Sequence, residues 1–313
     1  MPTNFPTGIS NRGVPVEGYA GIGSPLFTSG NVYWVDSGAG TADNDNAGTN
    51  PKQPLATVDG AVNKCTANNG DVIIVKPGHS ETLSAAAGIV FDVAGVTVIG
   101  QGTGNSRPTI TLDTAATTDI DVSAADVRIY NMIFSMNYAD IVQVFDLSAD
   151  GFTLDGCDVV DTAVNMNFVD LIKCTTTDNE CDRITVNNCY IASPDTGNDA
   201  VVEIGGDSDR LTFTDNYIRL GVSNSEAVIS VATGKDVTNC LIAGNYIYRL
   251  NSAGDLLIDS DTSDNTGIIA HNRIGHADTS GEVLVDADGV RQFDNTGTAT
   301  DTASGYPLPA IDS

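Results

Sequence analysis

An eight-residue pattern of apolar and polar residues recurs six times between residues 127 and 274. Positions one and three are mostly apolar, and position eight is apolar in every copy. The copies are VRIYNMIF from Val127, FTLDGCDV from Phe152, ITVNNCYI from Ile184, LTFTDNYI from Leu211, CLIAGNYI from Cys240 and GIIAHNRI from Gly267. Alternation with a period of two is typical of a strand that buries one face, so each copy predicts a strand with positions one and three turned inward.

The copies start 25, 32, 27, 29 and 27 residues apart, a spacing typical of one coil of a parallel β-solenoid. A second strand per coil is predicted at IDVS from Ile120, FDLS from Phe145, VEIG from Val202, ISVA from Ile229, IDSD from Ile258 and VDAD from Val285. Upstream, DVIIVKPG from Asp71 and GVTVIGQGTG from Gly95 are predicted to be the first coils. Roughly eight coils at the usual strand spacing predict an all-β rod about 40 Å long.

Position six of the pattern predicts a structural ladder. Asn216, Asn245 and Asn272 occupy this position in three successive copies. Asparagine suits the bend after a strand because it tolerates the left-handed backbone, and its amide can bond to the same amide one coil away.

Position seven predicts an outward aromatic ladder of Tyr190, Tyr217 and Tyr246, because it lies between two inward positions. Such a strip can stabilise neighbouring coils, contact a second chain or bind a sugar ring. The only tryptophan is Trp34, outside this strip, and tryptophan is the preferred platform for sugars. We therefore favour a protein interface over a glycan groove.

An acidic column is predicted where the residue between two inward positions of the second strand faces out. Its members are Asp121, Asp146, Glu203, Asp259 and Asp286, with Ser230 in the same row and Lys173 filling the remaining gap. Stacked carboxylates could bind Ca²⁺ or serve as the acid and base of a glycosidase. A solvated acidic face is the interpretation that we prefer.

A short helix is predicted near residues 55–65, directly behind a loop rich in Asn, Asp and Gly. Its apolar residues share one helical face, and Pro54 marks where the helix can begin. These residues are Leu55, Val58, Ala61, Val62 and Cys65. The first coil of a solenoid exposes an apolar end, so we expect this helix to cap it.

The stretch VYWVDSGAG…DNDNAGTNPKQPLATVDGAVNKC…GDVIIVKPGHSETL, residues 32–83, resembles the first segment of right-handed parallel β-helix proteins of the pectate-lyase-like superfamily. The resemblance implies a right-handed parallel β-helix with a short N-terminal capping helix. It does not imply one function, since the fold hosts lyases, hydrolases, phage tailspikes and purely structural virion proteins.

The resemblance carries no catalytic residue over to this chain. Pectate lyases use aspartate-bound Ca²⁺ and an arginine base, and the related polygalacturonases use Asn-Thr-Asp, Asp-Asp, His-Gly and Arg-x-Lys motifs. None of these hydrolase motifs occurs here.

The arginines recur beside strands and bends, which favours cross-coil ion pairs: Arg183, Arg210, Arg219, Arg249 and Arg273.

The formal charge is −27, from 41 acidic and 14 basic residues, which argues against nucleic acid and anionic membranes as partners. No apolar run reaches the roughly 18 residues of a membrane span, and the N-terminus lacks a secretory signal pattern. We therefore expect a protein made in a host cytoplasm. The six cysteines form no CxxC pair and have no nearby histidine, so we expect buried free thiols and no metal or cofactor.

Two terminal segments depart from the coil pattern. Residues 1–30 are predicted to be an extended attachment arm, and residues 296–313 an extended tail, on either side of a β-helix over residues 31–295. The apolar residues of the arm are predicted to contact a partner: Phe5, Ile9, Val14, Tyr19 and Phe27.

Arm, rod and tail together favour a non-enzymatic phage virion protein, a decoration or cement protein on the virion surface. We expect it to bind the major capsid protein through its arm and to form a homotrimer. The alternative is a tailspike-like polysaccharide depolymerase, a glycoside hydrolase or lyase that acts on host glycan beside the acidic column.

Overall fold

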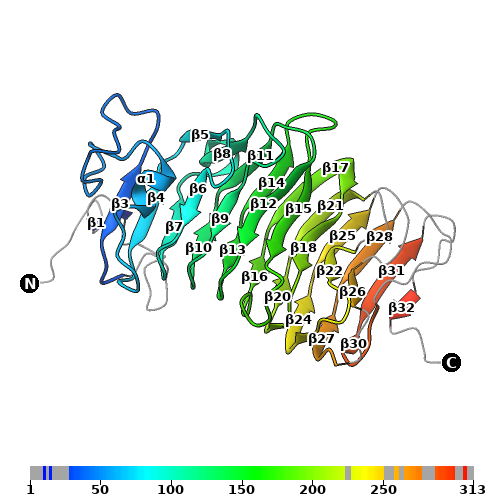
Figure 1. Ribbon diagram of the computed structural model, residues 1–313. Helices are drawn as coiled ribbons and strands as arrows, with labels where there is room; N and C mark the ends of the chain where they lie inside the picture. Colours follow the sequence, from blue (N-terminus) through cyan, green and yellow to red (C-terminus); the bar gives the residue numbers. More distant parts are fainter. Residues whose placement is uncertain are drawn as a thin grey trace, which may run out of the picture.

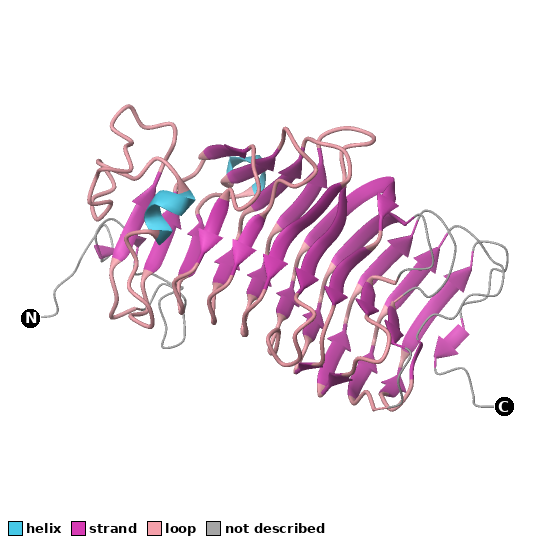
Figure 2. Ribbon diagram, viewed as in Figure 1, coloured by secondary structure: helices cyan, strands magenta, loops and turns pink. Residues whose placement is uncertain are grey.

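The computed structural model is a right-handed parallel β-helix in which the chain winds through three long sheets (Figure 1). Strands and loops make up nearly all of the described chain, and its helical segments are short (Figure 2). The structure describes residues 10–11, 14–15, 28–222, 227–249, 257–260, 264–276, 286–299 and 306–308. The fold class predicted from the sequence is confirmed.

Sheet 1 comprises β3 (Val32–Val35), β4 (Val72–Val75), β7 (Thr97–Gly100), β10 (Arg128–Tyr130), β13 (Thr153–Asp155), β16 (Thr185–Asn187), β20 (Thr212–Thr214), β24 (Cys240–Ala243), β27 (Gly267–Ala270) and β30 (Arg291–Phe293). Sheet 2 comprises β5 (Ser80–Leu83), β8 (Thr109–Leu112), β11 (Ile133–Met136), β14 (Asp158–Asp161), β17 (Tyr190–Asn198), β21 (Tyr217–Val222), β25 (Tyr246–Arg249), β28 (Arg273–His276), β31 (Asn295–Ala299) and the antiparallel β32 (Tyr306–Leu308). Sheet 3 comprises β6 (Ile89–Phe91), β9 (Ile120–Val122), β12 (Ile141–Leu147), β15 (Phe168–Cys174), β18 (Ala200–Ile204), β22 (Ile229–Val231), β26 (Ile258–Ser260) and β29 (Asp286–Ala287).

Smaller elements accompany these sheets. The strands β1 (Ser10–Asn11) and β2 (Val14–Pro15) pair antiparallel, and β19 (Ser208–Asp209) pairs in parallel with β23 (Val237–Thr238). A short 3₁₀ helix spans Gly104–Ser106. No helix in the described part of the chain is long and apolar enough to cross a membrane.

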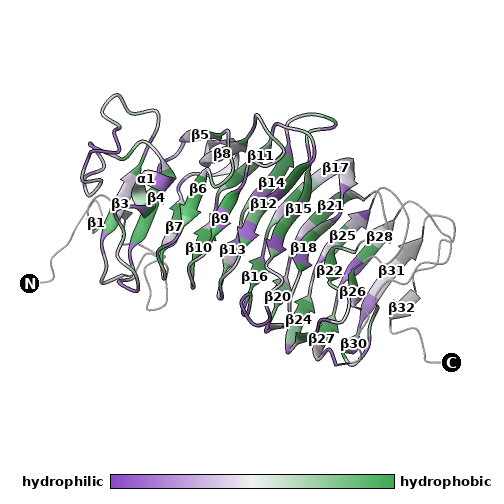
Figure 3. Ribbon diagram, in the orientation of Figure 1, coloured by the Kyte–Doolittle hydropathy of each residue, from purple (hydrophilic) through white to green (hydrophobic). Residues whose placement is uncertain are grey.

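One apolar core runs along the inside of the rod, because equivalent residues of successive coils stack in register. The position-eight residues form one such buried row: Phe134, Val159, Ile191, Ile218, Ile247 and Ile274. Figure 3 shows hydrophobic residues concentrated along the strands. Burying each aliphatic side chain contributes about 1.5 to 3 kcal/mol, so the repeat itself supplies the driving force for winding.

The bend from sheet 1 to sheet 2 needs a left-handed residue in every coil. The residue at position five has a positive φ in all six copies: Asn131, Gly156, Asn188, Asp215, Gly244 and His271. Glycine and short polar residues enter this conformation at the lowest cost. The left-handed residue therefore precedes the ladder asparagines at position six, and the expectation that those asparagines themselves take the left-handed backbone is wrong.

The helix α1 (Val58–Val62) covers the first coil, with Val58, Ala61 and Val62 buried in the core. Thr57 is its N-cap, and the Thr57 hydroxyl accepts a hydrogen bond of 3.0 Å from the backbone N–H of Gly60. The helix is shorter than the predicted range near 55–65. Leu55 lies outside it because its backbone forms a parallel bridge with Val35.

The β-helix continues past residue 295, where the predicted tail begins. Strand β31 pairs in parallel with β28 through Ala299, and β32 then pairs antiparallel with β31. The sequence placed the boundary too early because Asn295–Ala299 lacks the apolar alternation of the earlier coils.

Candidate functional site

Sheet 3 holds the predicted acidic column in one register row. In order along the rod, the row consists of Asp121, Asp146, Lys173, Glu203, Ser230, Asp259 and Asp286. Burial raises the pKa of Asp121 and of Asp146, and the charges of neighbouring aspartates raise both further. Asp121 and Asp146 are thus crowded carboxylates, and Lys173 follows them in the row as a cation.

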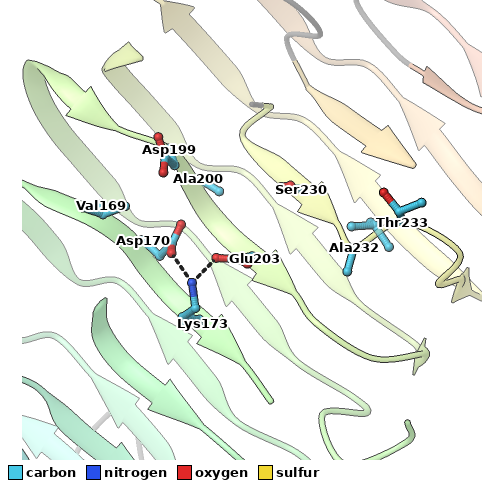
Figure 4. Close-up of a pocket in the computed structure, with 10 residues that line it drawn as sticks. Val169, Asp170, Lys173, Asp199, Ala200, Glu203, Ser230, Ala232 and Thr233 are labelled. Carbon is cyan, nitrogen blue, oxygen red and sulfur yellow. Dashed lines mark hydrogen bonds and ion pairs between the residues drawn. The ribbon is translucent and has the colours of Figure 1, made fainter. Parts of the chain in front are cut away.

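A hollow of about 370 Å³ opens beside the middle of this row (Figure 4). Residues of β15, β18 and β22 line it, together with the turn that follows β22. Asp170, Lys173 and Glu203 meet on its wall, with Ser230 further along the rod. The hollow therefore places a cluster of charged side chains next to space that a ligand could enter.

Asp170 is the buried member of this cluster, with a side chain only 2 % exposed. Its Oδ2 lies 3.0 Å from the Nζ atom of Lys173, whereas its Oδ1 is buried and accepts no hydrogen bond from a described group. Burial, followed by the hydrogen bond to Glu203 and the charge of Glu203, raises the pKa of Asp170 to about 8. Asp170 therefore binds its proton more tightly than an ordinary aspartate does.

Lys173 connects the two carboxyl groups. Its Nζ atom lies 2.5 Å from Oε2 of Glu203 in the next coil, as well as contacting Asp170. Burial acts to lower the pKa of Lys173, but the hydrogen bonds and charges of Glu203 and Asp170 outweigh it and raise the pKa to about 12. For Glu203, burial is outweighed by hydrogen bonds to Asp170 and Lys173, so its pKa is lowered.

Burial and Glu203 thus raise the pKa of Asp170, whereas the hydrogen bonds to Asp170 and Lys173 lower the pKa of Glu203. Their titration belongs to the pair, because each carboxyl group changes the proton affinity of the other. A neutral carboxylic acid next to an ionised carboxylate is the combination used in general acid–base chemistry.

The sequence interpretation placed Lys173 and Glu203 in the column but missed Asp170. A signal was present, because Asp170 has the same strand parity as Phe168 and Ile172, which are buried. A carboxylate at an inward position is expensive unless it is protonated or paired. Among the described residues, no group of three or more His, Cys, Asp or Glu side chains is arranged to hold a metal ion.

The three predicted ladder tyrosines lie together on the outer face of sheet 2. Tyr190, Tyr217 and Tyr246 are register partners and are 41, 45 and 44 % exposed. Their rings stack, with centroids 5.5 Å and 5.0 Å apart and nearly parallel planes. The strip is a rigid aromatic surface that faces solvent in the single chain.

The predicted asparagine ladder lies inside the rod. Asn216 donates to Oδ1 of Asn245 at 3.0 Å, and Asn245 donates to Oδ1 of Asn272 at 2.9 Å. A fourth member, Asn295, accepts from Asn272 at 2.9 Å, and the sequence interpretation missed it because its coil lacks the preceding apolar pattern. Each ladder amide also donates to a backbone carbonyl within the core, so the buried amides are held from two sides.

The arginines behave differently from one another. Arg183 reaches Asp126 and Asp150 in preceding coils, at 3.1 Å and 3.8 Å. Arg210 pairs instead with its neighbour in sequence, Asp209, and the described residues offer it no ion pair across coils. Two more arginines, Arg219 and Arg273, are exposed on sheet 2. Arg249 is fully buried.

The predicted contacts of the N-terminal arm are not tested by the structure. Phe5, Ile9, Tyr19 and Phe27 lie outside the described residues, and for Val14 only the backbone in β2 is described. Their role in attachment stays a prediction.

No protein-family model matches the sequence, and no curated protein matches it. Among solved structures, the rod is similar to a rhamnogalacturonan lyase at 11 % sequence identity and a TM-score of 0.46, over 84 % of this chain and 87 % of that one.

Proposed function

We propose that this protein is a non-enzymatic structural component of a phage virion, a decoration or cement protein on the capsid surface. Residues 1–30 bind the major capsid protein in this proposal, and the rods associate as homotrimers. The observation that carries the proposal is the stacked ladder of Tyr190, Tyr217 and Tyr246 on an open sheet face.

Exposed tyrosines in a fixed stack suit an interface between proteins. Tyrosine is enriched at such interfaces because it buries a large area and has few rotamers to lose. Stacking in register already restricts the rotamers of the three tyrosines before any partner binds. The strongly negative net charge supports the same function, since it keeps rods soluble and apart except where a specific surface joins them.

Two measurements test this proposal. Light scattering during gel filtration should give a mass above that of the single chain, and Tyr217→Ser should lower it without unfolding the rod. A chain that lacks residues 1–30 should stay folded and lose binding to capsids. A monomer at all concentrations, or unchanged capsid binding by the shortened chain, contradicts the corresponding part of the proposal.

A second candidate function, cleavage of a host polysaccharide, is favoured by the cluster of Asp170, Lys173 and Glu203. In this candidate the neutral Asp170 donates a proton to the glycosidic oxygen, and the ionised Glu203 acts as base or nucleophile on the sugar. Lys173 keeps the two carboxyl groups in different protonation states. The open hollow beside them would hold the glycan.

Release of reducing ends from a panel of bacterial surface polysaccharides tests the second candidate. Asp170→Asn and Glu203→Gln should abolish cleavage, while Asp178→Asn, an exposed aspartate outside the hollow, should retain it. Circular dichroism of each variant shows whether the β-helix is intact. Cleavage that survives both substitutions, or no cleavage of any substrate, counts against this candidate.

A further inference from the structure

We infer that residues 1–27 of this chain fold back and cover an apolar patch on the outer face of sheet 1, at the end of the rod where β3 lies. The patch consists of Val32, Trp34, Val72, Ile74 and Ile99 on β3, β4 and β7. This docking is a property of the isolated chain and does not depend on either function proposed above. A partner that binds the N-terminal segment has to displace it from the patch.

The patch lies on the outside of the rod, because its side chains alternate with those of the core. Ile73 and Val75 of β4 belong to the inner core, whereas Val72 and Ile74 of the same strand form a separate apolar cluster with Trp34. Successive residues of a strand point to opposite faces of the sheet. Strands β3, β4 and β7 are neighbours in sheet 1, so the cluster is continuous across them (Figure 1).

The patch is buried although it faces outward. Ile74 is 0 % exposed, and Trp34 and Val72 are each 3 % exposed. Toward the other end of the same sheet, the outward residues Leu241 and Ile268 are 40 % and 38 % exposed. Outward positions of one parallel sheet have similar backbone surroundings, so the difference requires a segment of chain that covers the first coils.

The described loop between β3 and α1 approaches the patch where β4 ends. The carbonyl of Pro51 accepts a hydrogen bond of 3.2 Å from Nζ of Lys76, the residue directly after β4. Val72 lies at the start of β4, and its register partner in β7, Thr97, is also only 8 % exposed. The start of β4 is about 10 Å from its end along an extended strand, so its burial requires a second covering segment.

Residues 1–27 join the described chain beside the start of β4. The hydroxyl of Thr28 donates a hydrogen bond to the carbonyl of Gly70, which lies two residues before Val72. Consecutive Cα atoms are about 3.8 Å apart, so Phe27 is within reach of the patch. The N-terminal segment therefore begins at the end of the patch that the loop before α1 leaves to another cover.

Residues 1–27 also have a composition that suits an apolar patch. Arg12 and Glu17 are their only charged side chains, although the whole chain carries 41 acidic and 14 basic residues. Covering the patch therefore takes few charges out of water, which would be costly. Fully extended, a segment of this length spans about 90 Å, several times the width of three strands. Its apolar residues are spread along it: Phe5, Ile9, Val14, Tyr19, Ile22 and Phe27.

The fluorescence of Trp34 tests this docking directly, because Trp34 is the only tryptophan of the chain. Removal of residues 1–27 should shift its emission to longer wavelength and raise its acrylamide quenching constant severalfold. Removal of residues 309–313 is the matched control and should change neither. A synthetic peptide of residues 1–27 should reverse both changes, and a peptide with the same composition in scrambled order should not. Circular dichroism shows whether each chain keeps its β-helix.

A substituted full-length chain keeps the test decisive if the shortened chain does not fold. The double variant Tyr19→Ser/Phe27→Ser changes no residue of the described coils and removes two large apolar side chains from the covering segment. It should raise the quenching constant of Trp34 while thermal unfolding of the rod stays cooperative.

Three results would overturn the inference. The first is a quenching constant that is the same in the wild type, the shortened chain and the double variant. The second is a wild-type emission spectrum that already matches the spectrum in urea. The third is quenching that rises when the wild type is diluted, because the cover then comes from a second copy. None of these measurements uses capsids or polysaccharides, so their failure is distinguishable from failure of the proposed functions.

Discussion

The side-chain nitrogen of Asn245 lies 2.9 Å from Oδ1 of Asn272, one coil further along the rod, and both residues are buried. The same nitrogen donates to the backbone carbonyl of Phe213, while Oδ1 of Asn245 accepts from the backbone and side chain of Asn216. One amide therefore ties three consecutive coils together.

Replacing this amide should weaken the rod strongly. In Asn245→Ala, the carbonyl of Phe213 and the donors of Asn216 lose their partner in the core, at about 1 to 3 kcal/mol for each unsatisfied group. With three such groups, we expect a loss of about 3 kcal/mol or more in the free energy of unfolding, measured with urea. Asn63→Ala, which removes an exposed amide bonded to Asp59, should cost less than about 1 kcal/mol. Equal effects of the two substitutions would show that the ladder is not a source of stability.

The raised pKa of Asp170 predicts a pH dependence of stability. The pKa of Asp170 is about 8 in the folded chain and about 4 when the chain is unfolded. Between these values the folded state binds one proton more, so the free energy of unfolding should fall as pH rises from about 4 to 8. Asp170→Asn keeps a neutral side chain at every pH, so it should flatten this slope and be more stable than the wild type above pH 8.

Urea unfolding of both chains at several pH values measures that slope. Asp178→Asn is the matched control. The hydrogen bond from Lys235 lowers the pKa of Asp178, so ionisation of Asp178 changes the stability only at or below the pH at which an ordinary aspartate titrates. The control should retain the decline between pH 5 and 8. A decline of the same size in Asp170→Asn would rule out Asp170 as its source.

The carboxylate of Asp71 anchors the first coil. Its Oδ1 accepts from the backbone N–H of Asn31 at 2.6 Å and from the side chain of Asn69 at 2.7 Å, and its Oδ2 accepts from the N–H of Thr66 at 2.7 Å. Asp71→Asn turns an NH₂ group toward the N–H of Thr66, which should cost about 1 to 3 kcal/mol.

Asp71→Ala should cost more than Asp71→Asn, because it leaves all three donors without the carboxylate. Glu180→Ala, a change at an exposed site, should stay within about 0.5 kcal/mol of the wild type. Chemical unfolding curves compare the three variants. Comparable stability of Asp71→Ala and Glu180→Ala would contradict the anchoring role.

The cysteines should report unfolding rather than react in the folded chain. All six are free thiols; Cys65 is partly buried, and the other five are buried. Burial raises the pKa of Cys65 to about 12, and its thiol also donates to the carbonyl of Ala61. Iodoacetamide at pH 8 should therefore modify almost none of the folded protein and all six thiols in urea, as measured by mass spectrometry. Rapid labelling of native protein would indicate a loosely packed core.

The sequence predicted the coils well because their signal is local and repeated. The apolar residues at positions one, three and eight recur at each strand, and their burial needs only the next coil. The same periodicity placed Tyr190, Tyr217 and Tyr246 on one row. The boundaries of elements were less predictable. Leu55 belongs to a β-bridge and not to the helix, because it pairs with Val35 in another segment of the chain.

The candidate site was predictable only in part, because its chemistry depends on how deeply each side chain is buried as well as on which residues pair between coils. Strand alternation was enough to place Glu203 and Lys173 in one row. The role of Asp170 depends on how far it is buried and on its approach to Glu203 from the adjacent coil. Charge alone could not reveal this, since the chain has 41 acidic residues and acidic side chains in general lie mostly at the surface.

The exact register between coils also bears on how such a chain can evolve. Cys240 pairs with Gly267 and Asn245 stacks on Asn272, so residues 240–266 form a unit whose two ends are equivalent. Loss of the codons for this unit would join Asn239 to Gly267 and leave every inner row continuous. Duplication would lengthen the particle by one layer of about 4.8 Å. Deletion or duplication of such units can therefore change the length of the rod by whole coils while the side-chain packing inside the rod stays the same.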